Sequence, residues 1–253
     1  MREARAVGFR FTPTTLALFS FAALAWAAAI ARAHQLGNGT GTMGMSLLSF
    51  IVMWSLMMTA MMLPAVALVA SLYAQTIRES RWVRVPLFVG GYLLVWVLAG
   101  VPAFGVLRIV DHLVGESAMT MRVIAGVVLV VAGAYQLTPL KDVCLSHCRS
   151  PMGQLLRFSK ESGRLRDVEF AVTHAAYCIA CCWLLMALFI AFGVMSVWAM
   201  VGLTLVVVLE KVARHGFGIG RVVGVVCLAL AVLVVVSPRV AGHVVPAPMT
   251  QSM

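Results

Sequence analysis

Three cysteines and a histidine stand close together in one apolar segment, at His174, Cys178, Cys181 and Cys182. On an α-helix each residue turns the chain by about 100°, so the four side chains would project from one sector about 100° wide. His174 and Cys182 would lie about 12 Å apart along the axis, whereas metal–thiolate bonds are about 2.3 Å long. One ion can therefore bind only part of this stripe, and its other ligands must come from elsewhere unless there are two sites.

Thiols and imidazoles in this arrangement suit a soft metal ion or redox chemistry. The alternative is that the cysteines are small residues that simply fill a buried helix surface. Three cysteines within five positions, in line with a histidine, favour a ligand or redox role.

Methionines form a second stripe in the segment MWSLMMTAMMLPA, where Met53, Met57 and Met61 recur every four residues. Thioethers are soft donors that suit Cu(I). Met57 would lie about 16 Å from the outer end of its helix, near the level that Cys178 reaches from the other side. We therefore predict that the two helices are neighbours and that Met57 or Met61 completes a site around Cys178. The alternative is that the methionines only fill gaps between helices.

Two further cysteines, Cys144 and Cys148, lie at the start of the polar segment 141–169. On a helical turn their thiols would face the same way. The charge pattern described below puts this segment in the cytosol, where reducing conditions argue against a structural disulfide. The pair is either a point of metal uptake or release at the surface, or a plain reduced pair. Cys227 has no partner in the sequence and is expected to be a packing residue, and we expect Glu210–Lys211 to be an interfacial pair at a helix end.

The elements that must position these residues are transmembrane helices. The chain is 62% hydrophobic and 11% charged, with a mean hydropathy of +1.00, which excludes an ordinary soluble domain. Runs of about 20 apolar residues are long enough to cross a hydrocarbon core of about 30 Å. The sequence predicts an all-α, polytopic helical bundle that forms a single domain over residues 1–253. Its seven spans are expected near residues 14–31, 46–73, 85–110, 121–138, 170–193, 194–209 and 217–237, with a tight hairpin at Gly193 between the fifth and sixth.

The net charge of +10 orients the chain in the bilayer and does not indicate nucleic-acid binding. Of the 19 Lys and Arg residues, 15 fall on the side of the N-terminus and of the second, fourth and sixth loops. Positive residues concentrate on the cytoplasmic side of membrane proteins, so we expect a cytoplasmic N-terminus and an external C-terminus. The first apolar segment could instead be a cleaved signal peptide, because ARA precedes His34.

Four segments together resemble a bacterial family catalogued as predicted metal-binding integral membrane proteins: MWSLMMTAMMLPA, AYQLTPLKDVCLSHCRSP, CIACCWLLM and the later LEK. The resemblance runs from about Met53 to Lys211. It implies a location in the bacterial inner membrane, and it implies that five cysteines belong to the family pattern: Cys144, Cys148, Cys178, Cys181 and Cys182. It supplies no established reaction.

The function that we predict is Cu(I) handling, meaning transport, storage or delivery of the ion to a protein partner. Carboxylates that would hold Mg²⁺ or Mn²⁺ are missing from the relevant spans, whereas a zinc site of Cys and His ligands stays open. One alternative is a membrane thiol–disulfide oxidoreductase that uses Cys178 and Cys181, although buried thiols do not favour an enzyme. The other is a structural subunit of a membrane complex. Lipid and a metal donor or acceptor protein are the expected partners.

Overall fold

The computed structural model describes residues 13–36, 41–77, 80–115, 117–149 and 164–245, which form helices joined by short turns. In chain order the helices are α1 (Pro13–Leu36), α2 (Leu47–Thr76), α3 (Arg81–Val114), α4 (Ala118–Gln136), α5 (Pro139–Arg149), α7 (Arg164–Phe192), α8 (Val197–Val212), α9 (Gly216–Val236) and α10 (Pro238–Val244). No strand occurs within these ranges. The predicted all-α class is confirmed.

Six of the described helices are long and apolar enough to cross a membrane, namely α1, α2, α3, α4, α7 and α9. Helix α8 falls in the predicted sixth span, but its 16 residues would cover only about 24 Å. The predicted hairpin lies where it was expected, because α7 ends at Phe192 and Gly193 turns the chain with a φ of 90°. About seven spans is therefore close to the observed architecture.

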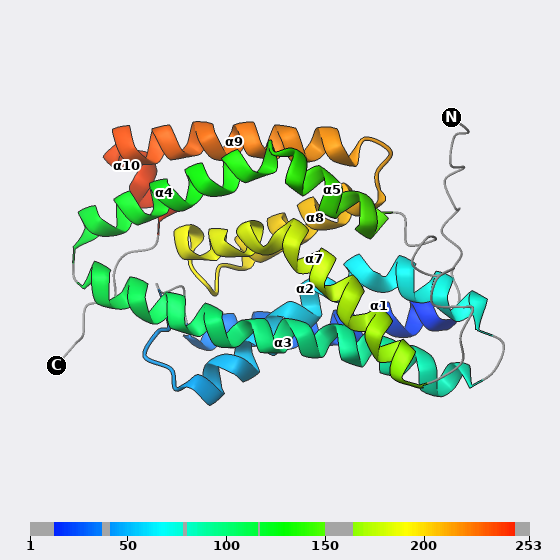
Figure 1. The fold of residues 1–253 in the computed structure, drawn as a ribbon. Coiled ribbons are helices and arrows are strands. Elements are labelled where there is room, and N and C mark those ends of the chain that lie inside the picture. Colours follow the sequence, from blue (N-terminus) through cyan, green and yellow to red (C-terminus); the bar gives the residue numbers. More distant parts are fainter. Residues whose placement is uncertain (1–12, 37–40, 78–79, 116, 150–163, 246–253) are drawn as a thin grey trace.

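The long helices and α8 alternate in direction along the bundle, whereas α5 continues in the direction of α4 (Figure 1). The connections α2–α3 and α8–α9 and the end of α5 lie toward one end, and the connections α3–α4 and α7–α8 lie toward the other. Helices α2 and α7 are the most enclosed of the candidate spans. In their most apolar stretches 61% and 56% of the residues are buried, against 22–33% in the other candidate spans. The cysteine stripe of α7 and the methionine stripe of α2 thus both belong to the interior helices.

A polar clamp holds the beginning of α7 against α2 and α3. Asp167, which is buried, accepts hydrogen bonds from the Tyr73 hydroxyl and from Arg84, whose Nη2 lies 2.7 Å from Oδ1. The ring of Phe170 packs on the rings of Tyr73 and Phe88, with centroid distances of 5.2 and 4.7 Å. Helices α2 and α7 are therefore in contact at this end, and the clamp fixes the register of α7 just before its cysteines.

The first part of the predicted polar segment 141–169 is not a surface loop. Residues 139–149 form α5, which packs against α7 and α8, and residues 150–163 lie outside the described ranges. The buried face of α5 consists of Lys141, Cys144, Leu145 and Cys148. The spacing of these residues is that of one helical stripe. The expectation that Cys144 and Cys148 lie at the surface is therefore wrong, because α5 folds back onto the bundle and buries both side chains.

Candidate metal centre

Four buried thiols from two helices meet inside the bundle. Within α7, the sulfur of Cys182 lies 3.3 Å from that of Cys181 and 4.0 Å from that of Cys178. The sulfur of Cys148, from α5, lies 3.7 Å from that of Cys181. Each of these four side chains is at most 4% exposed. The additional donor that the α7 stripe requires is thus offered by a cysteine of α5.

The spacing of the sulfurs is that of potential ligands to one ion. Two thiolates bound at about 2.3 Å to the same ion lie about 3.8 Å apart in tetrahedral geometry and about 4.0 Å apart in trigonal geometry. The observed separations of 3.3 to 4.0 Å bracket these values. Over the described ranges, however, no three His, Cys, Asp or Glu side chains are already arranged around a common metal position. The thiols are close enough to bind an ion after small side-chain rotations.

A lysine and a tyrosine contact the innermost thiol. The Lys211 amine donates a hydrogen bond to the Cys178 sulfur over 2.8 Å, and the Tyr92 hydroxyl lies 3.0 Å from the same sulfur. Lys211 comes from the last turn of α8 and Tyr92 from α3, and both are buried. Cys178 therefore has a positive charge beside it in an apolar interior, which stabilises a thiolate.

The neighbouring Glu210 is equally buried and pairs with α5. The Lys141 amine contacts both carboxylate oxygens of Glu210, at 2.7 and 2.9 Å, and the Gln136 amide donates to Oε1 over 2.9 Å. Glu210 and Lys211 are 2% and 7% exposed, so the expectation of an interfacial pair is wrong. The two charged side chains have different partners: Glu210 binds Lys141 of α5, and Lys211 binds Cys178 of α7.

His174 lies apart from the cysteines, among aromatic side chains. Its ring is 5.9 to 6.2 Å from the rings of Phe88, Tyr92 and Phe170, and its Nδ1 has no hydrogen-bond partner within the described part of the chain. Within the described residues the imidazole forms no hydrogen bond to a cysteine sulfur. The helical sector predicted from the sequence is reasonable, but the imidazole packs among the aromatic rings of Phe88, Tyr92 and Phe170.

The other predicted donors, on α2 and α5, are buried as well. Met57 and Met61 are fully buried in α2, but the recorded sulfur contacts of Cys178, Cys181 and Cys182 involve no methionine. Cys144 lies on the buried face of α5 at 9% exposure. Cys227 lies against Gly133 where α9 packs on α4, in agreement with a packing role.

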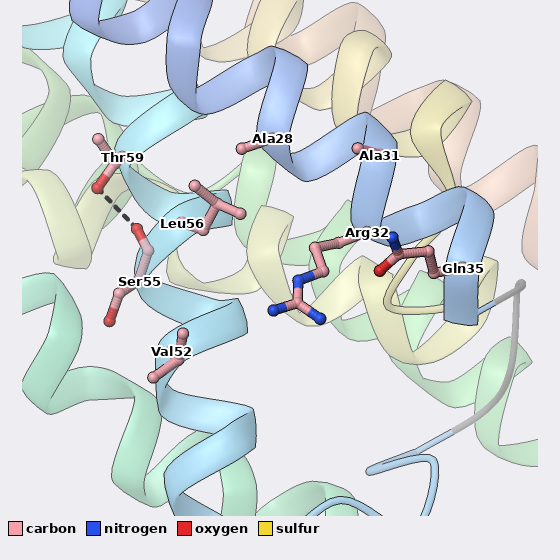
Figure 2. A pocket seen from close by; sticks show the side chains of 8 residues that line it. All are labelled: Ala28, Ala31, Arg32, Gln35, Val52, Ser55, Leu56 and Thr59. Carbon is pink, nitrogen blue, oxygen red and sulfur yellow. Dashed lines mark hydrogen bonds between the residues drawn. The ribbon is translucent and has the colours of Figure 1, made fainter.

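An open groove lies elsewhere, between α1 and α2 (Figure 2). It has a volume of about 730 Å³ and is lined by Ala28, Ala31, Arg32, Gln35, Val52, Ser55, Leu56 and Thr59. None of these side chains carries a sulfur or an imidazole. The hydroxyls of Ser55 and Thr59 are bound to backbone carbonyls of their own helix. This groove is therefore not a candidate for the metal centre.

Sequence reasoning missed Tyr92, Lys211, Glu210 and Lys141 as parts of the site. For Lys141, Glu210 and Lys211 the signal was a charged residue at the end of an apolar segment, since intramembrane charges usually have a function. Tyr92 gave no such signal. The sequence does not indicate that Lys141 pairs with Glu210 or that Lys211 contacts Cys178.

Comparison with protein families shows where the chain belongs. The family model described as PpoB2, copper chaperone, matches residues 51–234, a range that contains all four clustered cysteines together with Tyr92, Lys141 and Lys211. No curated protein and no solved structure matches the chain. Because the match covers well over half of its length, the chain belongs to the PpoB2 copper chaperone family.

Proposed function

We propose that this protein is an integral membrane copper chaperone that holds Cu(I) as cargo between Cys148 of α5 and the cysteines of α7. The observation that carries the proposal is the contact between the Cys148 and Cys181 sulfurs, which joins two helices through soft donors alone. Buried thiolates prefer soft ions such as Cu(I). The six apolar helices and the family membership support a copper protein of the membrane.

The charges around the cluster favour a soft monovalent ion over hard divalent ions. Mg²⁺ and Mn²⁺ require several oxygen ligands. The buried carboxylate nearest to the site, that of Glu210, is already bound to Lys141 and Gln136. The donors that remain at the cluster are its sulfurs and the single hydroxyl of Tyr92, with the Lys211 amine as a local positive charge. Two or three thiolates suffice for Cu(I), whereas zinc in proteins usually takes four ligands.

The position of the cluster suits transfer of the ion. Helix α5 is short and lies at the end of the bundle where α8 ends and α9 begins (Figure 1). Cys144 and Cys148 occupy its buried face, and the α7 cysteines follow further inside. A copper ion could move from Cys144 to Cys148 and on to Cys181 by exchanging one thiolate at a time. A protein that donates or accepts copper would then meet α5.

The proposed location is the bacterial inner membrane, with the N-terminus and α5 on the cytoplasmic side. The support is the distribution of Lys and Arg residues, together with the alternation of helix directions (Figure 1). A thiol–disulfide oxidoreductase has less support, because the sulfur of each α7 cysteine is enclosed and exchange requires access for a second thiol.

Copper binding by cysteine variants tests the proposal. The protein is purified in detergent without oxygen, loaded with Cu(I), passed over a desalting column and analysed for copper by mass spectrometry. We expect Cys181→Ser, and the double variant Cys178→Ser with Cys182→Ser, to lose most of the copper. Cys227→Ser is the matched control, because it removes a buried cysteine outside the cluster and should retain the copper. Wild-type copper content in the cluster variants would overturn the proposal.

A further inference from the structure

Helix α5 is attached to the bundle by polar contacts at both of its ends. Near its start, Lys141 pairs with Glu210, and at its last residue Arg149 reaches the same end of α8. Its buried face contains Leu145 as the one large apolar side chain, next to Lys141 and the two cysteines. A helix of 11 residues is too short to be stable in isolation. The polar contacts are therefore important in holding α5 in its position on the bundle.

Arg149 caps the carboxyl end of α8. Its guanidinium donates hydrogen bonds to the carbonyl oxygens of Glu210 and Ala213, the latter over 2.6 Å, and lies 5.3 Å from the centre of the Phe217 ring. The last carbonyls of a helix have no partners within the helix and carry partial negative charge, so a guanidinium is a favourable cap. Gly216 provides the space, because a β-carbon there would collide with the guanidinium.

We propose that Arg149 is a positioning residue for copper binding, which places the adjacent Cys148 against Cys181, and that the Lys141–Glu210 pair shares this task. This inference rests on the proposed function. The last turn of α8 then organises both halves of the site: its carbonyls and Glu210 hold α5, and Lys211 contacts Cys178 on α7. Loss of the cap would let the end of α5 move and would separate Cys148 from the other thiols.

The variant Arg149→Gln tests this role with two measurements on the full-length protein in detergent. The first is the Cu(I) dissociation constant, obtained by competition with a chromogenic Cu(I) chelator. The second is the rate at which N-ethylmaleimide alkylates Cys148 in the copper-free protein, followed by peptide mass spectrometry. Since loss of a residue that orients a metal ligand typically lowers metal affinity 10- to 100-fold, we expect weakening of about that size. Alkylation of Cys148 should become faster, because the thiol is buried in the wild type.

The matched control is Arg221→Gln. Arg221 also contacts α5, through Asp142 at 3.5 Å, but its side chain is 67% exposed and it caps no helix. It should bind copper and protect Cys148 as the wild type does. Arg149→Lys keeps the charge with fewer hydrogen bonds and should fall between wild type and Arg149→Gln. It also provides a measurable variant if Arg149→Gln does not fold.

A double variant shows whether Arg149 acts through Cys148. If it does, adding Arg149→Gln to Cys148→Ser should weaken copper binding no further. An additive loss, or wild-type affinity and protection in Arg149→Gln, would overturn the inference. If the cluster cysteines prove irrelevant to copper, the proposed function fails, while the alkylation rate still reports whether Arg149 positions Cys148.

Discussion

The amine of Lys211 lies 2.8 Å from the sulfur of Cys178, and both side chains are buried in the bundle. Lys211 is the residue after Glu210, whose carboxylate already has Lys141 as its partner. The positive charge of Lys211 is therefore left for the cysteines to balance. An isolated charge in an apolar interior is strongly unfavourable, so the cation and a thiolate stabilise each other.

Replacement of Lys211 by methionine should weaken Cu(I) binding. A Cu(I) ion held by two thiolates carries a net negative charge, and Lys211 is positioned to balance it. Without that cation the buried complex is less stable, and we expect the dissociation constant to rise about tenfold or more. The measurement is competition with a chromogenic Cu(I) chelator. Arg214→Met removes an equal charge from the exposed region just after α8 and should leave the affinity unchanged. Unchanged or tighter binding in Lys211→Met would show that Lys211 does not balance the bound complex.

The Lys141–Glu210 pair should contribute strongly to the free energy of unfolding, and the effect of replacing one partner should depend on whether the other is present. Removing one partner of a buried ion pair typically lowers the free energy of unfolding by about 3–5 kcal/mol, because the other charge is left without a partner. Lys141→Met and Glu210→Gln should each lower the unfolding temperature in detergent, as followed by intrinsic fluorescence. The double variant should lose less than the sum of the two.

The control for this cycle is Asp142→Asn, which removes the pair with Arg221, a pair that is partly exposed on the Asp142 side. Exposed pairs contribute about 0–1 kcal/mol, so the unfolding temperature should barely change. Strictly additive losses for Lys141 and Glu210 would contradict direct coupling between them.

The sequence predicts the helices and the stripe on α7 well, because hydropathy and helical periodicity depend on local residues. The hairpin at Gly193 and the shared burial of Cys178, Cys181 and Cys182 are examples. The place of Cys148 could not be predicted in the same way. It depends on contacts between α5 and α8, over 61 to 69 positions of the chain, that turn a polar segment back onto the bundle.

Two site residues were misjudged for a related physical reason. Glu210 and Lys211 close an apolar segment, which is where charges usually face the membrane surface. The structure buries them because α5 covers the end of α8.

His174 shares the helical sector of the cysteines, yet it lies among aromatic rings one turn away along the axis. A stripe on a helix gives the direction of side chains but not which of them meet.

The methionine stripe of α2 still provides a testable hypothesis. Met57 and Met61 are buried, and α2 meets α7 through Tyr73 and Phe170 near one end of each helix. If a thioether completes the coordination of Cu(I), the double variant Met57→Leu with Met61→Leu should weaken copper retention while the unfolding temperature changes little, because the volumes nearly match. Met121→Leu, a buried methionine of α4, is the control. Wild-type copper retention in the double variant would assign both methionines to packing.

The orientation of the chain gives the last prediction, because the transfer route depends on it. The 15 Lys and Arg residues on the side of the N-terminus and of the even-numbered loops predict that α5 and its cysteines face the cytoplasm. Reporter enzymes fused after Gly41 and after Ser159 test this, although Ser159 lies outside the described residues. A reporter that is active only outside the cytoplasm should work at Gly41 and fail at Ser159. The reverse pattern would place α5 on the external side, and copper would then reach Cys148 from outside the cell membrane.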